Sequence, residues 1–211
     1  MTTTEKNCEQ TNFLADTFDP ESFIFSTPKK YKTAEIMASR IKNKNKERVM
    51  VQFPKMTVAS KLAKNIELEF ITGNGYTKKV SSFLSRLDDF VINFIVSHSE
   101  EWFGKPIPIE NINQMYKRTN VTLKFVLAKS EFINKQNETV PRDEIVKGNT
   151  IECISYLKYI VFTKDTCFLH WEICTAKIHK LMKKVAKFGF IDDPDDESDD
   201  ELSDEDEVTF F

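Results

Sequence analysis

The longest periodic segment of the chain lies between residues 77 and 103 and predicts one long amphipathic helix. Its apolar side chains recur every three or four residues, at Val80, Phe83, Leu84, Leu87, Val91, Phe94 and Ile95. That spacing places them on one face of a helix. Thr77 is the expected N-cap, and Gly104 with Pro106 is typical of a helix end. A shorter helix is expected from Ile109 to Lys117.

Strand-like segments lie on both sides of this helix. They are predicted at 22–25, 35–41, 48–53, 66–72, 122–128, 151–162 and 167–178. The polar run 42–46 predicts a hairpin loop, Pro54 is expected to end a strand, and the turn 163–165 predicts a final antiparallel hairpin. Trp171, which alternates with apolar neighbours, is expected in the core, and Trp102 is expected to pack the helix against the sheet.

This order of elements predicts a mainly β fold. We expect an OB-fold-like antiparallel barrel with the helix between its third and fourth strands. A mixed α+β fold with an open sheet is the alternative. The predicted organisation is an N-terminal arm, 1–21, which is either disordered or lies across the body, then a domain, 22–191, and a tail, 192–211.

The charge of the chain is divided between two regions of opposite sign. The formal net charge is −3, but 12 of the 33 acidic residues lie between 192 and 207. The rest of the chain holds 21 acidic residues against 30 Lys and Arg, so its net charge is about +9. A body this basic attracts polyanions, and a block this acidic competes with them.

The acidic block is expected to be disordered, because it lacks apolar residues that would offset the entropy of folding. It ends in two aromatic residues, Phe210 and Phe211. Aromatic side chains at the tip of a charged arm fit a basic, apolar pocket or a partner protein. The residues predicted to bind partners through this tail are Asp204, Glu205, Asp206, Glu207, Phe210 and Phe211.

Basic residues gather in two further segments, which are the candidates for binding nucleic acid. The first contains Lys29, Lys30, Tyr31, Lys32, Arg40, Lys42, Lys44, Lys46 and Arg48, and the second contains Lys177, Lys180, Lys183, Lys184 and Lys187. Lysines around a barrel can follow the phosphates, and aromatic faces such as Tyr31 can stack on bases. A lysine run is also typical of an ordinary solvated loop, so the collective charge is the stronger evidence.

The chain offers no arrangement that predicts catalysis, a cofactor or a metal. It has no glycine-rich phosphate loop and no defensible nucleophile beside its three histidines. Cys167, His170 and Cys174 have a metal-like spacing, but on a strand Cys167 points away from the other two and a fourth ligand is missing. No apolar segment is long enough to span a bilayer, so no membrane association is expected. The four cysteines are expected to be free thiols in a reducing compartment.

With these features assembled, the chain resembles the acidic-tailed single-stranded-DNA-binding proteins of nucleocytoplasmic large DNA viruses, which are similar to the protein of T-seven-type phages. The matching segments are 25–30 (FSTPKK), 52–54 (QFP), 101–105 (EWFGK) and the acidic tail ending in Phe211. The resemblance spans most of 22–211. It implies an OB-fold, a homodimer, and roles in DNA replication, recombination and repair. It also implies a tail that shields the DNA cleft and recruits a DNA polymerase or helicase-primase.

The sequence therefore predicts sequence-independent binding to single-stranded DNA, in the cytoplasm or nucleus of an infected cell. Two alternatives remain at this point. One is a histone or nucleic-acid chaperone that uses the acidic tail, and the other is a virion structural protein that binds no nucleic acid.

Overall fold

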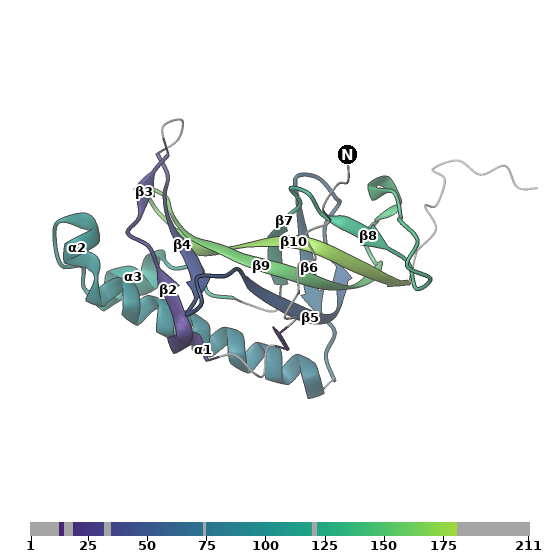
Figure 1. Cartoon of the computed structure of the whole chain (residues 1–211), viewed down its shortest axis with the longest axis horizontal. Coiled ribbons are helices and arrows are strands. Elements are labelled where there is room, and N and C mark those ends of the chain that lie inside the picture. The colour runs from purple at the N-terminus through teal and green to yellow at the C-terminus, as the bar shows by residue number, and fades with distance from the viewer. Residues whose placement is uncertain (1–12, 15–18, 32–34, 74, 120–121, 181–211) are drawn as a thin grey trace, which may run out of the picture.

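The computed structural model describes residues 13–14, 19–31, 35–73, 75–119 and 122–180 of the chain. Within these residues the protein is mainly β, with one long helix along a twisted sheet (Figure 1). The strands are β1 (Phe13–Leu14), β2 (Phe23–Phe25), β3 (Lys29–Lys30), β4 (Met37–Asn43), β5 (Val49–Val58), β6 (Asn65–Phe70), β7 (Thr122–Val126), β8 (Glu131–Ile133), β9 (Thr150–Phe162) and β10 (Cys167–Lys180). The helices are α1 (Gly75–Ser97), α2 (Ser99–Phe103) and α3 (Ile109–Met115), and 3-10 turns cover Pro20–Ser22 and Arg142–Glu144.

Five strands form a closed circuit in the order β5, β6, β7, β10 and β9, because β9 pairs again with β5. The pairing of β7 with β10 is parallel, and the other four pairings are antiparallel. This confirms the predicted OB-like barrel and not the alternative, a mixed α+β fold with an open sheet. Helix α1 follows the third long strand of the sequence, as predicted. In the circuit, however, it connects β6 to β7, which are the second and third barrel strands and not the third and fourth.

Helix α1 buries the predicted apolar face. Six of the seven side chains that define the stripe are buried, and Phe94 is partly buried against the core. The predicted N-cap is wrong, because the helix already begins at Gly75 and the Thr77 side chain is buried inside its first turn. At the other end, Gly104 adopts a left-handed φ of 74° and its N–H donates to the Glu100 carbonyl at 2.9 Å. That conformation suits glycine and closes α2 as expected.

The predicted hairpin between the second and third strand segments is also wrong. Strand β4 pairs with β9 from Met37 to Arg40, and β5 continues along the same edge of β9 from Val49. Both strands therefore run in one direction along β9. The polar residues 44–48 between them form a loop that leaves this line, which we call the detour. It closes on itself because the Glu47 N–H donates to the Asn43 side chain at 2.8 Å, and the Asn43 N–H donates to the Glu47 carbonyl at 3.1 Å.

Pro54 does not end the strand that contains it. Strand β5 continues to Val58, with an irregularity in its pairing to β9 between Phe53 and Met56. A bulge is the place where a strand tolerates a residue without an N–H donor.

The predicted final hairpin is confirmed, with β9 and β10 joined at residues 163–166. Its inward side chains include Trp171, which is 2% exposed and meets Phe53 edge-to-face at 5.1 Å between ring centres. Trp102 packs against Phe162 of β9, as expected for a residue that holds the helical region to the sheet.

Two predicted segments lie largely outside the described residues. The tail, 192–211, is one of them. Of the N-terminal arm, 1–21, the described part includes Phe13 and Leu14, which pair in parallel with Val51 and Gln52 of β5. Among the helices that the structure describes, none is both long and apolar enough to cross a membrane.

Candidate nucleic-acid interface

The outer face of the β9–β10 hairpin carries an uncommon combination of aromatic and cationic side chains. Alternation along β9 turns Ile151, Cys153 and Leu157 inward, and leaves Tyr156 and Lys158 on the outer side. An irregularity in the pairing between His170 and Trp171 puts Tyr159 on that outer side as well. A local bulge therefore places a lysine and a tyrosine next to each other on the open face.

Strands β3 and β4 bring a second group of such side chains to Tyr159. Ser26, Lys29, Lys30, Tyr31, Arg40 and Tyr159, with Ala38, line a hollow of about 440 Å³, which we call the β4 hollow. Its wall is held by Ser26, whose N–H donates to the Arg40 carbonyl at 3.0 Å and whose hydroxyl accepts from the Arg40 N–H at 2.9 Å. The Ser39 hydroxyl, which is buried, donates to the Ser26 carbonyl at 2.5 Å.

Tyr159 is the point where the polar contacts of the β4 hollow converge. Hydrogen bonding with Tyr31 lowers the pKa of Tyr159 most, hydrogen bonding with Arg40 and the charges of Arg40 and Lys158 add to the effect, and partial burial opposes it. The Arg40 guanidinium lies 5.9 Å and the Lys158 Nζ 5.6 Å from the centre of the ring. Tyr31 remains 47% exposed, so this cluster presents a large aromatic surface to solvent.

The same pattern continues along the outer face. The Arg48 guanidinium lies 5.5 Å from the centre of the Tyr156 ring. Lys158 Nζ contacts the Glu172 carboxylate at 2.7 Å, and this hydrogen bond raises the pKa of Lys158, which is therefore charged at neutral pH. The His170 ring meets the Tyr159 ring at 6.0 Å, and burial lowers the pKa of His170, which favours its neutral form. Cations and flat rings thus alternate across the two strands.

The structure brings part of the predicted set together. Lys29, Lys30, Tyr31 and Arg40 meet at the β4 hollow, while Arg48 sits on Tyr156. Lys44 and Lys46 are exposed on the detour between β4 and β5, and Lys42 lies at its start, opposite Ile24 of β2. Lys32 lies outside the described residues.

The second predicted group is at the other end of β10. Lys177 Nζ lies 3.5 Å from the Asn137 side-chain oxygen, and Lys180 is the exposed last residue of the strand. Lys183, Lys184 and Lys187 lie outside the described residues, as do the tail residues from Asp204 to Phe211. Their predicted roles stay predictions.

Sequence reasoning missed Lys158 and His170 as members of the interface. The signal was present, because strict alternation over 151–158 assigns Lys158 to the outer face. The bulge that adds Tyr159 and aligns it with His170 has no such signal.

The metal-like spacing of Cys167, His170 and Cys174 does not form a cluster. Cys167 is buried on the inner face, whereas His170 and Cys174 lie on the outer one. In the described part of the chain, no three His, Cys, Asp or Glu side chains are grouped closely enough to hold a metal ion.

Comparison with solved structures gives distant likenesses, among them two phage proteins. No protein-family model matches the chain, and no curated protein matches it in sequence. The crystal structure of gp2.5, a single-stranded DNA binding protein encoded by bacteriophage T7, is similar with a TM-score of 0.47 at 11% identity. The likeness covers 76% of this chain and all of the phage chain.

The second likeness is to a single-stranded DNA-binding protein from bacteriophage Enc34. It has a TM-score of 0.38 at 8% identity, and covers 78% of this chain and 94% of the other. At these values neither structure assigns a function to this chain, so the function rests on the residues themselves.

Proposed function

We propose that this protein binds single-stranded DNA without sequence preference, through the outer face of β9 and β10 and the β4 hollow. The observation that carries the proposal is the cluster around Tyr159, where Tyr31, Arg40 and Lys158 surround one half-buried ring. Unpaired bases stack on such rings irrespective of their identity, and neighbouring cations follow the phosphates. Paired bases are not available for stacking, so the geometry favours single strands.

The affinity should depend steeply on salt, because each contact between a cation and a phosphate releases condensed counterions. For single strands the expected slope of log K against log salt is about −0.7 for each phosphate contacted. Stacking on an aromatic ring adds roughly 1–3 kcal/mol for each base.

The acidic tail is the second part of the proposal. Residues 192–207 carry 12 carboxylates and the rest of the chain is about +9, so the tail and DNA compete for one surface. A tethered segment reaches a local concentration on the order of millimolar, which makes even a weak competitor effective. Once DNA displaces it, the tip with Phe210 and Phe211 is free to recruit a replication protein such as a DNA polymerase or helicase-primase. We place this activity in viral DNA replication, recombination and repair, in a homodimer, in the cytoplasm or nucleus of the infected cell.

A gel-shift titration of the intact chain and of a variant that ends at residue 191 tests both parts. Labelled oligonucleotides, single- and double-stranded, are titrated across a salt series. The proposal requires a preference for single strands, a steep loss of affinity with salt, and tighter binding after truncation. A variant with the acids of 192–207 replaced by Asn and Gln separates charge from chain length, and should behave like the truncation.

The same titration distinguishes the two other functions that the sequence allows. A histone or nucleic-acid chaperone would lose its main activity with its tail. A virion structural protein would shift neither oligonucleotide. Binding of the two oligonucleotides with equal affinity would contradict the stacking argument, even if the salt dependence were steep.

A further inference from the structure

A second basic hollow opens between β7 and β10. These two strands pair at only two positions, Trp171 with Phe125 and Glu172 with Val126. The segment that follows α3 lies beside the start of β10 instead, where the Lys117 N–H donates to the Cys167 carbonyl at 2.7 Å. A hollow of about 550 Å³, which we call the β7 hollow, remains between the strands and this segment.

The lining of the β7 hollow combines cations with flat or apolar side chains. Lys117 and Lys124 supply positive charge, Arg118 lines the hollow while paired with Asp89, and Phe168 and His170 supply rings. None of the residues that line it is acidic. Lys117 and Lys124 are both exposed, so their ammonium groups are accessible to a phosphate. This is the chemistry of the β4 hollow, repeated at a second place.

The two hollows meet on the outer face of the hairpin. His170 lines the β7 hollow, and Tyr159 lines the β4 hollow. Their rings are in edge-to-face contact, with centres 6.0 Å apart. A single-stranded DNA that passes from Tyr159 toward β10 would therefore reach the β7 hollow directly.

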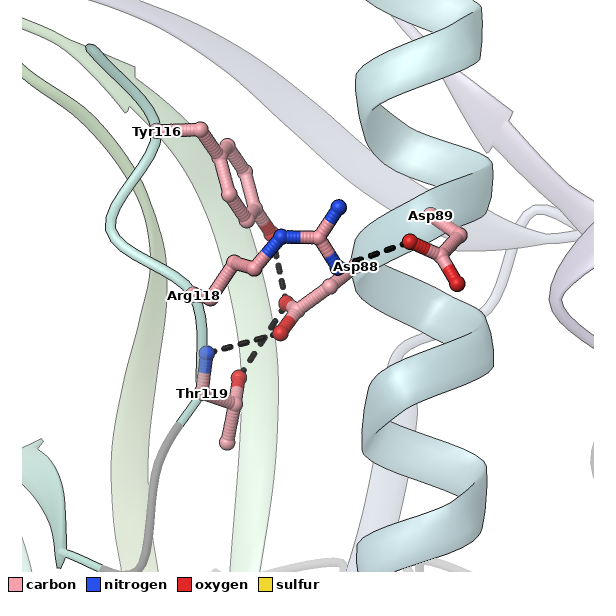
Figure 2. Close-up of polar contacts among 5 residues, drawn as sticks. All are labelled: Asp88, Asp89, Tyr116, Arg118 and Thr119. Atoms are coloured by element: carbon pink, nitrogen blue, oxygen red, sulfur yellow. Dashed lines mark hydrogen bonds and ion pairs between the residues drawn. The ribbon is translucent and has the colours of Figure 1, made fainter. Parts of the chain in front are cut away.

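A buried carboxylate holds the wall of the β7 hollow in place (Figure 2). Asp88 of α1 is 1% exposed and accepts three hydrogen bonds from the segment after α3. The donors are the Tyr116 hydroxyl at 2.8 Å, the Thr119 N–H at 2.7 Å and the Thr119 hydroxyl at 3.1 Å. Next to it, the Arg118 guanidinium contacts the Asp89 carboxylate at 2.7 Å. Residues 117 and 118 lie between the two anchor points of Asp88, so their backbone has little freedom.

We propose that the β7 hollow is a second subsite for the same single strand, with Lys117 and Lys124 on its phosphates and Phe168 and His170 beside a base. This inference rests on the proposed function and extends its footprint from β4 across β9 and β10 to β7. Asp88 is a positioning residue for this subsite, because it touches no nucleotide and acts through the segment 116–119.

The length dependence of binding tests the subsite. Fluorescence anisotropy measures the affinity of the intact chain for oligothymidylates of about 5 and about 15 nucleotides, lengths at the two ends of the usual range for one OB-fold. The variant Lys117→Gln/Lys124→Gln should bind the short oligonucleotide within twofold of wild type. It should bind the long one about tenfold more weakly, with a salt slope reduced by about 1.4, or about 0.7 for each lysine.

A matched control is the variant Lys135→Gln/Lys147→Gln. It removes the same charge from two exposed lysines near the opposite end of β10, which line neither hollow. It should leave both affinities within twofold of wild type. If it lowers the affinity for the long oligonucleotide as much as the first variant does, the effect comes from net charge and the proposed subsite is overturned.

The role of Asp88 is tested by Asp88→Asn, which keeps the shape of the side chain and one acceptor oxygen. The variant should bind the short oligonucleotide like wild type and bind the long one at least threefold more weakly. A loss of structure alone would lower both affinities equally. It would also lower the fraction of active protein, which is titrated at high concentration.

The possible failures are distinguishable. If the intact chain binds neither oligonucleotide, the proposed function and the subsite both fail. If it binds both, and the variant Lys117→Gln/Lys124→Gln keeps full affinity for the long one, the proposed function stands and the subsite is overturned. An equal loss for both lengths would also overturn it, because the two hollows would then not be separate subsites.

Discussion

The two ends of the β9–β10 ribbon use polar side chains in opposite ways. At one end, which we call the cationic end, Arg40 and Tyr31 are exposed beside the Tyr159 ring, and Lys158, which is paired with Glu172, lies over the same ring. At the other, the paired end, Glu152 accepts from Gln52 at 2.6 Å and contacts His179 at 3.0 Å. The paired end sets an acid against a histidine and an amide and also carries Lys177 and Lys180, whereas the cationic end places its cations beside open aromatic rings. Cations beside open rings, more than the number of lysines, identify a surface for an unpaired polynucleotide.

The largest contrast should appear in stability, between Asp88, which anchors the wall of the β7 hollow, and Glu152 at the paired end. Asp88→Ala removes the acceptor of three hydrogen bonds and leaves the buried Tyr116 hydroxyl without its partner. Each unsatisfied buried group costs about 1–3 kcal/mol, so we expect a loss of roughly 2–4 kcal/mol in the free energy of unfolding. Glu152→Ala at the paired end, where the acid is partly exposed, should cost less than about 1 kcal/mol. Urea denaturation of both variants measures the difference, and equal losses would contradict the assignment of Asp88 as an anchor.

Binding should show the next largest contrast. Tyr159→Ala removes the ring at the centre of the cationic end and should weaken binding to an oligothymidylate by about 1–3 kcal/mol, or roughly 5- to 150-fold. Tyr159→Phe keeps the ring and should stay within about threefold of wild type. On the paired end, Ile154→Ala should have less than a twofold effect in the same anisotropy titration. A Phe variant as weak as the Ala variant would mean that the phenol oxygen, and not stacking, carries the affinity.

The pH dependence of stability sharpens the contrast further, because burial raises the pKa of Asp88 above its ordinary value, despite its hydrogen bonds to Thr119 and Tyr116. The folded chain then holds a proton at a pH where the unfolded chain, with an Asp pKa of about 4, has lost it. This group therefore stabilises the fold less as the pH rises above about 4, until the folded carboxyl is ionised as well. Relative to Asp88→Asn, wild type should lose stability across that window. An unchanged difference in the denaturation midpoints from pH 4 to 7 would contradict the raised pKa.

The smallest expected effects are those of single cations on the affinity and on its salt dependence. Arg40→Gln should lower the salt slope by about 0.7, corresponding to one phosphate contact on a single strand. Lys177→Gln removes a lysine beside Asn137, away from the rings of the cationic end, and should weaken binding less than threefold. If the Lys177 variant loses as much affinity as the Arg40 variant, the footprint covers both ends of the ribbon and the contrast between them disappears.

Local pattern predicted the elements of this fold better than their arrangement. Helix α1 was predictable because its apolar side chains follow one period, and the β9–β10 hairpin because a short turn joins two alternating segments. The direction of β4 relative to β5 was not, because both depend on β9, which lies about a hundred residues later in the chain. Thr77 has the residue type of an N-cap. Its side chain is instead buried by the packing of α1, which the local sequence does not indicate.

In the candidate site too, the sequence predicted which residues take part better than which residues meet. The basic segment from Lys29 to Arg48 was evident from composition, and four of its members meet at the β4 hollow. The pairing of Tyr31 with Tyr159 and of Asp88 with Thr119 joins residues that are far apart in sequence. Neither has a local signal, so the centre of the site and the whole β7 hollow needed the structure.

The detour between β4 and β5 has a consequence for how this protein can change. Because Asn43 and Glu47 close it with their own hydrogen bonds, the strands on either side keep their register on β9 whatever the length of the tip. Exposed tips closed in this way are where chains accept added residues. Descendants of this sequence, or an engineer fusing a reporter peptide at Asn45, can enlarge this tip beside the Arg48–Tyr156 pair without disturbing the barrel.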